Sequence, residues 1–168
     1  MAAEQSPKGA GESPVRLGEF LIRKGFIDTQ QLEEALQKQR SSREFLGTIL
    51  VEKGYITEEQ LLSVLSEQFR MPRFNLTKDY YIDWNLAMKF STALLLENKC
   101  FPLRRDRRAI VFGITNPLNA LGMSKAAEEA RGEKVEFVLV LESEMEEALE
   151  RYRYHVNVRI RNMLDGGK

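Results

Sequence analysis

The clearest pattern along the chain is a unit of apolar and polar positions that occurs twice. Residues 16–39 align with residues 45–68, and ten of the 24 aligned positions are identical. In each copy, apolar residues at helical spacing precede a lysine and then a glycine, Gly25 or Gly54. This order predicts a short helix that ends at a left-handed cap. A duplication of this kind predicts two structurally equivalent helix pairs.

Each copy continues with a start signal for a second helix. Asp28 precedes Gln31 by three residues, and Thr57 precedes Gln60 by three, which is the spacing of a capping box. Both copies then carry an apolar stripe that ends in a glutamine, with members Leu32, Ala35, Leu36 and Gln39 in the first copy and Leu61, Val64, Leu65 and Gln68 in the second. We therefore expect a small all-helical tandem-repeat domain over residues 15–70.

After the repeat, the pattern changes to that of an α+β domain. Proline at position 72 disfavours helix before it, so residues 71–83 are expected to form a linker. The elements expected beyond it are a helix (84–98), a two-strand hairpin (100–103 and 109–114), a helix (118–131), a strand (135–141) and a helix (142–154). The fold class is therefore α+β, with a helical tandem-repeat domain followed by an α+β domain over residues 84–155.

Composition limits the chemistry and the location of the chain. Residues 1–14 are rich in Pro, Gly, Ser and Ala and predict a flexible tail, whereas residues 156–168 are expected to be a connector or tail. The 25 basic and 25 acidic residues cancel, which argues against nucleic acid as a partner. The chain has one cysteine, Cys100, and one histidine, His155, which are too few to form a disulfide framework or a zinc site. No apolar run suits a signal peptide or a membrane span, so we expect a cytoplasmic protein without direct membrane insertion.

The duplicated pattern, beginning with Arg16-Leu17-Gly18 and repeated after a five-residue spacer, resembles the MshEN domain. This domain is the amino-terminal module of type II secretion and type IV pilus assembly ATPases of the GspE and PilB kind. The resemblance extends to about residue 155 through segments 101–106, 110–117 and 142–152. It implies a bacterial regulatory and docking region that connects the ATPase motor to the cytoplasmic part of an inner-membrane secretion protein, with recruitment to the inner membrane face.

The resemblance also implies cyclic di-GMP as a candidate ligand, with no cofactor required. Because cyclic di-GMP is twofold, two equivalent helix pairs can offer each half the same surface. An arginine can stack on guanine and donate two hydrogen bonds to its edge. The positions that match the family's motif are Arg16, Leu17, Gly18, Leu32, Leu36 and Gln39 in the first copy, and Leu46, Gly47, Leu61, Leu65 and Gln68 in the second.

The second copy departs from the family at its first position. Phe45 stands where the second arginine is expected, and a phenylalanine can stack on a base but cannot donate to it. Loss of one bidentate contact, about 1–3 kcal/mol, predicts binding weaker by about one to two decades. Arg43 lies two residues earlier, although that offset points its side chain to another face of a helix.

A structural interpretation of the same residues stays open. The leucines can form core, Gly18 and Gly47 can permit close helix packing, and Gln39 and Gln68 can cap backbone groups. The alternative function is a ligand-free adaptor that docks to an inner-membrane secretion component. The arginine-rich segment 104–108 is either a contact for an acidic partner or a solvated hairpin tip.

The chain lacks the phosphate-binding loop of those ATPases, Gly-x-x-x-x-Gly-Lys-Ser/Thr. We therefore expect no ATP hydrolysis and no enzymatic activity from it. Both a fragment of a longer ATPase and a standalone relative fit this sequence. Ligand or partner binding is expected to bring the two repeat halves together and to reorient the second domain through residues 71–83.

Overall fold

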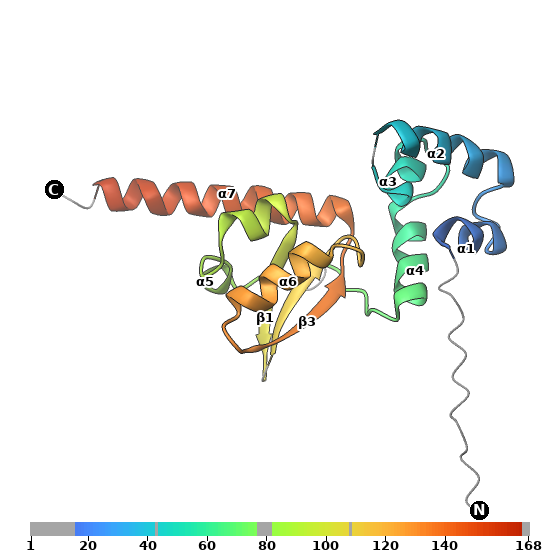
Figure 1. The fold of residues 1–168 in the computed structure, drawn as a ribbon. Helices are drawn as coiled ribbons and strands as arrows, with labels where there is room; N and C mark the ends of the chain where they lie inside the picture. The colour runs from blue at the N-terminus through green and yellow to red at the C-terminus, as the bar shows by residue number, and fades with distance from the viewer. Residues whose placement is uncertain (1–15, 43, 77–81, 108, 166–168) are drawn as a thin grey trace, which may run out of the picture. The chain divides into compact units, whose positions relative to one another are not determined.

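The computed structural model describes residues 16–42, 44–76, 82–107 and 109–165. The chain forms two compact units, Met1–Tyr55 and Ile56–Lys168, called the first and second unit here (Figure 1). The expected tail at residues 1–14 lies outside the described residues. The division falls inside the second repeat copy, whereas the domain bounds inferred from sequence, 15–70 and 84–155, remain predictions about independently folding parts.

Three helices make up the first unit: α1 (Leu17–Arg23), α2 (Thr29–Ser42) and α3 (Leu46–Glu52). Helix α3 packs against both α1 and α2. The side chains with no solvent exposure are Leu21, Ala35, Ile49 and Leu50. Each of α1 and α3 is followed by a glycine in the left-handed region, with φ of 71° at Gly25 and 72° at Gly54. The helix ends expected from the sequence are confirmed at both glycines.

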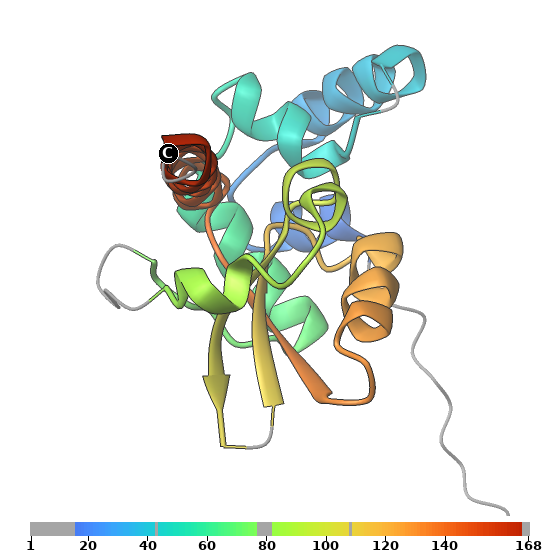
Figure 2. The ribbon, with the colours of Figure 1, turned by 90° about the vertical axis from the view of Figure 1, so that its left-hand side faces the viewer.

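The second unit starts with α4 (Glu58–Phe69) and continues with α5 (Trp84–Ala87) and a π-helical turn, η1 (Ala93–Glu97). A three-stranded sheet follows, formed by β1 (Cys100–Asp106), β2 (Ala109–Ile114) and β3 (Lys134–Leu139) in that spatial order (Figure 2). Helix α6 (Ala120–Glu129) connects β2 to β3, and α7 (Glu142–Asp165) ends the described chain.

The sheet mixes both kinds of strand pairing. Strands β1 and β2 form the expected antiparallel hairpin, with a register shift between Pro102 and Arg104 where proline cannot donate to the ladder. Strand β3 pairs with β2 in parallel, which is why a crossover helix lies between them. All six residues of β2 are buried, as expected for the central strand. Phe101 and Phe112 are the largest fully buried side chains of this core.

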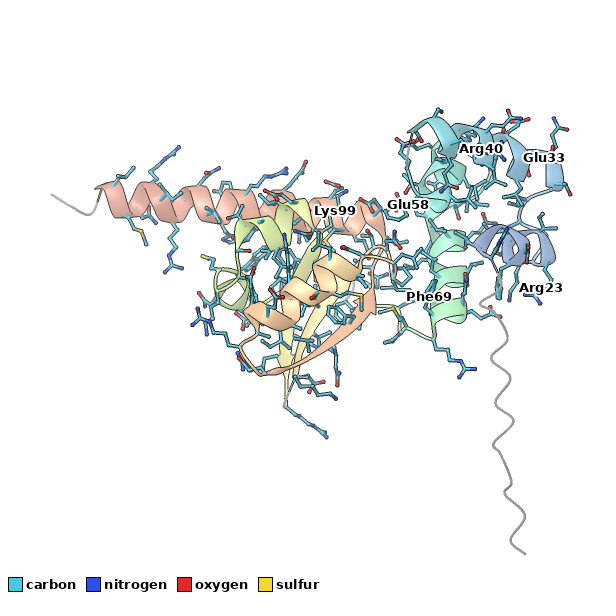
Figure 3. The ribbon with its side chains drawn as sticks, viewed as in Figure 1. Arg23, Glu33, Arg40, Glu58, Phe69 and Lys99 are labelled. Atoms are coloured by element: carbon cyan, nitrogen blue, oxygen red, sulfur yellow. The ribbon has the colours of Figure 1, made fainter. Side chains whose placement is uncertain are left out.

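Two contacts attach the start of the second unit to its sheet and last helix. The Phe74 amide donates to the Leu139 carbonyl at 2.8 Å, and the Leu139 amide donates to the Pro72 carbonyl at 2.8 Å. The Glu58 carboxylate of α4 accepts from the Ser143 amide at 3.2 Å and from its hydroxyl at 2.7 Å. Glu58 extends from α4 toward the first turn of α7 (Figure 3). A side chain of α4 thus caps α7.

The α+β fold class is confirmed, but two helix expectations are wrong. The helix expected over residues 84–98 is interrupted between α5 and η1, because Ser91 begins a new turn. Its hydroxyl accepts from the Leu94 amide, and its amide donates to Glu129. The last helix runs to Asp165 instead of ending near residue 154, because no glycine or proline follows until Gly166.

Candidate functional site

The first position of the duplicated motif lies at the start of α1. Arg16 is its N-cap, with extended backbone angles of φ −60° and ψ 138°. Its carbonyl accepts the first helical bond from the Phe20 amide at 3.0 Å. The Arg16 side chain makes no capping bond and is exposed. Arg16 is thus an exposed cation at the start of α1.

Phe45 occupies the equivalent position at the start of α3. Its backbone angles, φ −71° and ψ 140°, are close to those of Arg16, and its carbonyl accepts from the Ile49 amide at 3.2 Å. The ring is 55% exposed, which is unusual for a phenylalanine that contributes to a core. The two copies thus present an arginine and a phenylalanine from the same backbone geometry.

Packing accounts for two of the predicted site residues. A Cβ atom on Gly18 would lie 2.6 Å from Leu32 Cδ1, so a larger residue there would force the Leu32 side chain of α2 to move. Gly18 is buried, whereas Leu32, Leu17 and Leu36 are half-buried. For Gly18, this contact is the close helix packing that the structural interpretation expects. The half-buried leucines keep part of their surface exposed.

Gln39 has a backbone partner. Its Nε2 donates to the Glu44 carbonyl at 3.0 Å and thereby joins the end of α2 to the segment before α3. With this bond, Gln39 caps a backbone carbonyl, as the structural interpretation of the sequence expects. Among the remaining predicted residues, Leu46 and Gly47 lie on α3 in the first unit, whereas the second unit holds Leu61, Leu65 and Gln68, all on α4. Gly47 and Leu65 are buried, and the other three are half-buried.

A polar cluster beside the motif was not anticipated from the sequence. The Tyr55 hydroxyl donates to Glu34 Oε2, and Lys53 Nζ lies 3.6 Å from that oxygen and 5.4 Å from the Tyr55 ring centre. The hydrogen bond from Tyr55, supported by the charge of Lys53, lowers the pKa of Glu34, and the same bond raises the pKa of Tyr55. The available signal was a tyrosine where the first copy has Phe26.

The other candidate residues are engaged within the second unit. Arg105 pairs with Glu133, and the Arg104 guanidinium lies 4.9 Å from the Phe74 ring centre, while Arg108 lies outside the described residues. The His155 ring lies 4.5 Å from that of Trp84. Burial raises the pKa of the Cys100 thiol to about 12, so this thiol stays protonated at neutral pH.

Two kinds of feature are absent from the described ranges. Among these residues, no group of three or more His, Cys, Asp or Glu side chains is placed to hold a metal ion. In the same part of the chain, every helix is too short or too polar to cross a bilayer.

Comparison with known proteins agrees with this architecture. The MshEN domain family matches the chain over residues 69–156, and the chain belongs to that family. It is 30% identical over 137 residues to the type IV pilus assembly ATPase PilB of Myxococcus xanthus, a match that covers 82% of this chain and 24% of PilB. The chain thus spans about a quarter of the length of that relative.

Two solved structures share the fold. A structure of MshE with cdg, cyclic di-GMP, superposes with a TM-score of 0.71 at 23% identity and covers 82% of this chain and 98% of that one. The N-terminal domain of XpsE gives a TM-score of 0.64 at 17% identity and covers 81% and 92%. The resemblance to the amino-terminal regions of secretion and pilus assembly ATPases is confirmed. The family match itself begins at Phe69, the last residue of α4, and so lies entirely after the duplicated motif.

Proposed function

We propose that this chain is a non-catalytic regulatory and docking domain of a pilus assembly or secretion ATPase, and that its duplicated motif binds cyclic di-GMP. The observation that carries the proposal is the equivalence of Arg16 and Phe45. Both are exposed N-cap residues with nearly the same backbone angles. The fold shared with MshE, which was solved with cyclic di-GMP, supports the choice of ligand.

The chemistry of the two positions suits two guanine bases unequally. The Arg16 guanidinium can stack on one base and donate to its O6 and N7, and it can also neutralise a phosphate. The Phe45 ring can stack on a base, a contact of about 1–3 kcal/mol, but offers no donor. We therefore expect cyclic di-GMP to bind more weakly than it would to a motif with two arginines.

The docking part of the proposal concerns the larger assembly. The chain matches 24% of the length of PilB, a pilus assembly ATPase. The remainder of such a protein would supply the motor. We propose that the chain lies on the cytoplasmic side and contacts the cytoplasmic part of an inner-membrane secretion protein. Cyclic di-GMP would regulate this contact only through a difference in affinity between free and docked states.

Isothermal titration of cyclic di-GMP into the purified chain tests the ligand. We expect saturable binding that Arg16→Ala weakens at least about tenfold and that Phe45→Arg strengthens about tenfold to a hundredfold. Arg23→Ala is the matched control, because Arg23 is another exposed arginine on α1 (Figure 3). GMP and ATP should give no comparable heat. Silence from both the wild-type chain and Phe45→Arg would contradict the proposal.

A second candidate function is the ligand-free adaptor. It is favoured by the engagement of Gly18 in helix packing and of Gln39 in a backbone hydrogen bond, since both are motif positions with structural tasks. This function predicts no cyclic di-GMP binding by any variant. It also predicts direct binding of the chain to the purified cytoplasmic part of an inner-membrane secretion protein, with an affinity that cyclic di-GMP leaves unchanged.

A further inference from the structure

The second half of α7 forms one wall of a groove in the second unit. Helix α7 extends past α5 and the sheet toward the end of the chain (Figure 1). The groove has a volume of about 330 Å³, and the segment between α5 and η1 forms its other wall. Its apolar lining comprises Met88 and Phe90 from that segment and Tyr152, Val156, Ile160 and Met163 from α7. Ile160 and Met163 are more than half exposed.

The same stretch of α7 is basic. Residues 151–164 include four arginines and a histidine and no aspartate or glutamate. Arg151 pairs with Glu147 in the preceding turn. Among the described residues, Arg153, Arg159 and Arg161 form no ion pair, and Arg159 Nη1 donates to the Met88 sulfur at 3.1 Å. Arg159 lines the groove, and Arg153 lies on the same stretch of α7, so two cations near an apolar groove have no ion-pair partner in the described part of the chain.

A second copy of the chain is a poor occupant on grounds of charge. Two copies of residues 151–164 would bring arginines together, which costs free energy. The first half of α7 is acidic, but four of its five carboxylates, all except Glu150, already have partners. Glu142 and Glu146 both pair with Lys99, Glu147 pairs with Arg151, and Glu144 is buried and accepts from the Leu76 amide. An antiparallel pair of α7 helices would therefore leave most of these arginines uncompensated.

The shape of the groove selects among the remaining anionic partners. Its apolar side chains lie on two facing walls, so a planar lipid surface could not reach them all. Val156, Ile160 and Met163 follow the i, i+4, i+7 spacing with which helices interlock. We propose that this groove binds an amphipathic helix of another protein, whose apolar side chains fill the groove and whose flanking carboxylates pair with Arg153 and Arg159. This proposal does not depend on the duplicated motif.

A designed peptide tests the proposal. The probe is a labelled 18-residue helix with leucines at i, i+4 and i+7 and glutamates beside them, and the control has the same composition with the leucines distributed around the helix. Fluorescence anisotropy with the full chain should show saturable one-to-one binding of the probe, which weakens as salt is added. The control peptide should bind at least about tenfold more weakly. Equal affinity for both peptides would overturn the proposal.

Variants on the two sides of α7 locate the contact. Ile160→Glu should weaken probe binding about tenfold or more, because it places in the groove a negative charge that repels the glutamates of the probe. Val158→Glu is the matched control, since Val158 is 39% exposed on the same helix and does not line the groove. It should bind as the wild type does. Arg159→Glu should prefer a version of the probe with lysines in place of glutamates. Circular dichroism verifies that each variant is folded.

Two other results would overturn the proposal in favour of a different occupant. The first is co-sedimentation of the chain with phosphatidylglycerol vesicles in the absence of any probe binding, which would assign the basic segment to a membrane surface. The second is a concentration-dependent dimer in analytical ultracentrifugation that Ile160→Glu dissociates and Val158→Glu does not. That result would assign the groove to a second copy of the chain.

Discussion

The two copies of the repeat have the same backbone bonds and different exposed side chains. Amides of Gly25 and Gly54 donate to carbonyls three residues earlier at 2.8 and 2.9 Å. The capping boxes of α2 and α4 each contain two reciprocal bonds between residues three apart. Among the positions that differ, the first bears most directly on a ligand, because one copy has Arg16 there and the other Phe45. The duplication thus preserves a scaffold, while the groups that could contact a ligand have diverged.

The largest expected loss of stability comes from substitutions in the buried core of either copy. Leu21 and Leu50 are equivalent positions, and neither is exposed to solvent. Leu21→Ala and Leu50→Ala should each lower the free energy of unfolding by about 2–5 kcal/mol, through lost burial and the cavity left behind. Urea denaturation measures this loss. Phe45→Ala, at an exposed side chain, is the control, and a large loss there would mean that the Phe45 ring contributes to the core.

A smaller effect is expected at the two left-handed glycines. A Cβ atom added to Gly25 or Gly54 would meet nothing within 4 Å, so the cost of alanine comes from the backbone alone. Gly25→Ala and Gly54→Ala should each destabilise by about 1–2 kcal/mol, with asparagine costing less than alanine. Thermal unfolding of the four variants measures both. A clear difference between the two sites would show that the two scaffolds are not equivalent.

The capping boxes should contribute slightly less. Asp28 and Thr57 accept from the amides of Gln31 and Gln60 at 2.8 and 3.1 Å. Asp28→Ala and Thr57→Ala should each cost about 1 kcal/mol in a urea titration, whereas Asp28→Asn and Thr57→Ser should retain most of the bond. Stability that is unchanged by both alanine variants would mean that solvent satisfies these amides equally well.

The smallest expected effect is a pH dependence of stability that comes from Tyr55, a residue of the second copy. The hydrogen bond between Tyr55 and Glu34 holds the pKa of Glu34 below its ordinary 4.5 and the pKa of Tyr55 above its ordinary 10.0. Its stabilisation is therefore present between these values. It is lost as the pH falls through the lowered pKa of Glu34 and as the pH rises through the raised pKa of Tyr55.

Tyr55→Phe tests this dependence, because it gives the second copy the phenyl ring that the first has at Phe26. The stability difference between the wild type and the variant, measured by urea denaturation, should be greatest near neutral pH and shrink toward both extremes. Glu34→Gln should remove the acid-side change while leaving the alkaline side dependent on Tyr55. A difference that stays constant from pH 3 to pH 11 would contradict the assignment.

Local signals in the sequence were sufficient for much of the scaffold. Gly25, Gly54 and the two capping boxes are all found where the spacing predicts them, because the interactions that form them span five residues or fewer. The hairpin of β1 and β2 was predicted because only a short charged turn separates its two apolar strands.

Contacts between distant residues could not be predicted in the same way. The parallel pairing of β3 with β2, the bond from Ser91 to Glu129 and the cap that Glu58 provides to α7 join residues far apart in the chain. No periodicity in the sequence signals such partners. At the candidate site, the motif identified Arg16 as the exposed cation, but the bond from Gln39 to the Glu44 carbonyl depends on how the chain turns between α2 and α3.

The cap that Glu58 provides to α7 has a consequence for synthesis of the protein. Its partner, Ser143, is made 85 residues later. At about 5–20 residues per second, Glu58 is added to the chain about 4–17 s before that partner exists. The three helices of the first unit belong to a compact unit that ends at Tyr55, so we expect them to form while the second unit is still incomplete. Nascent chains stalled before residue 143 should therefore protect α1, α2 and α3 from protease and leave α4 open to cleavage.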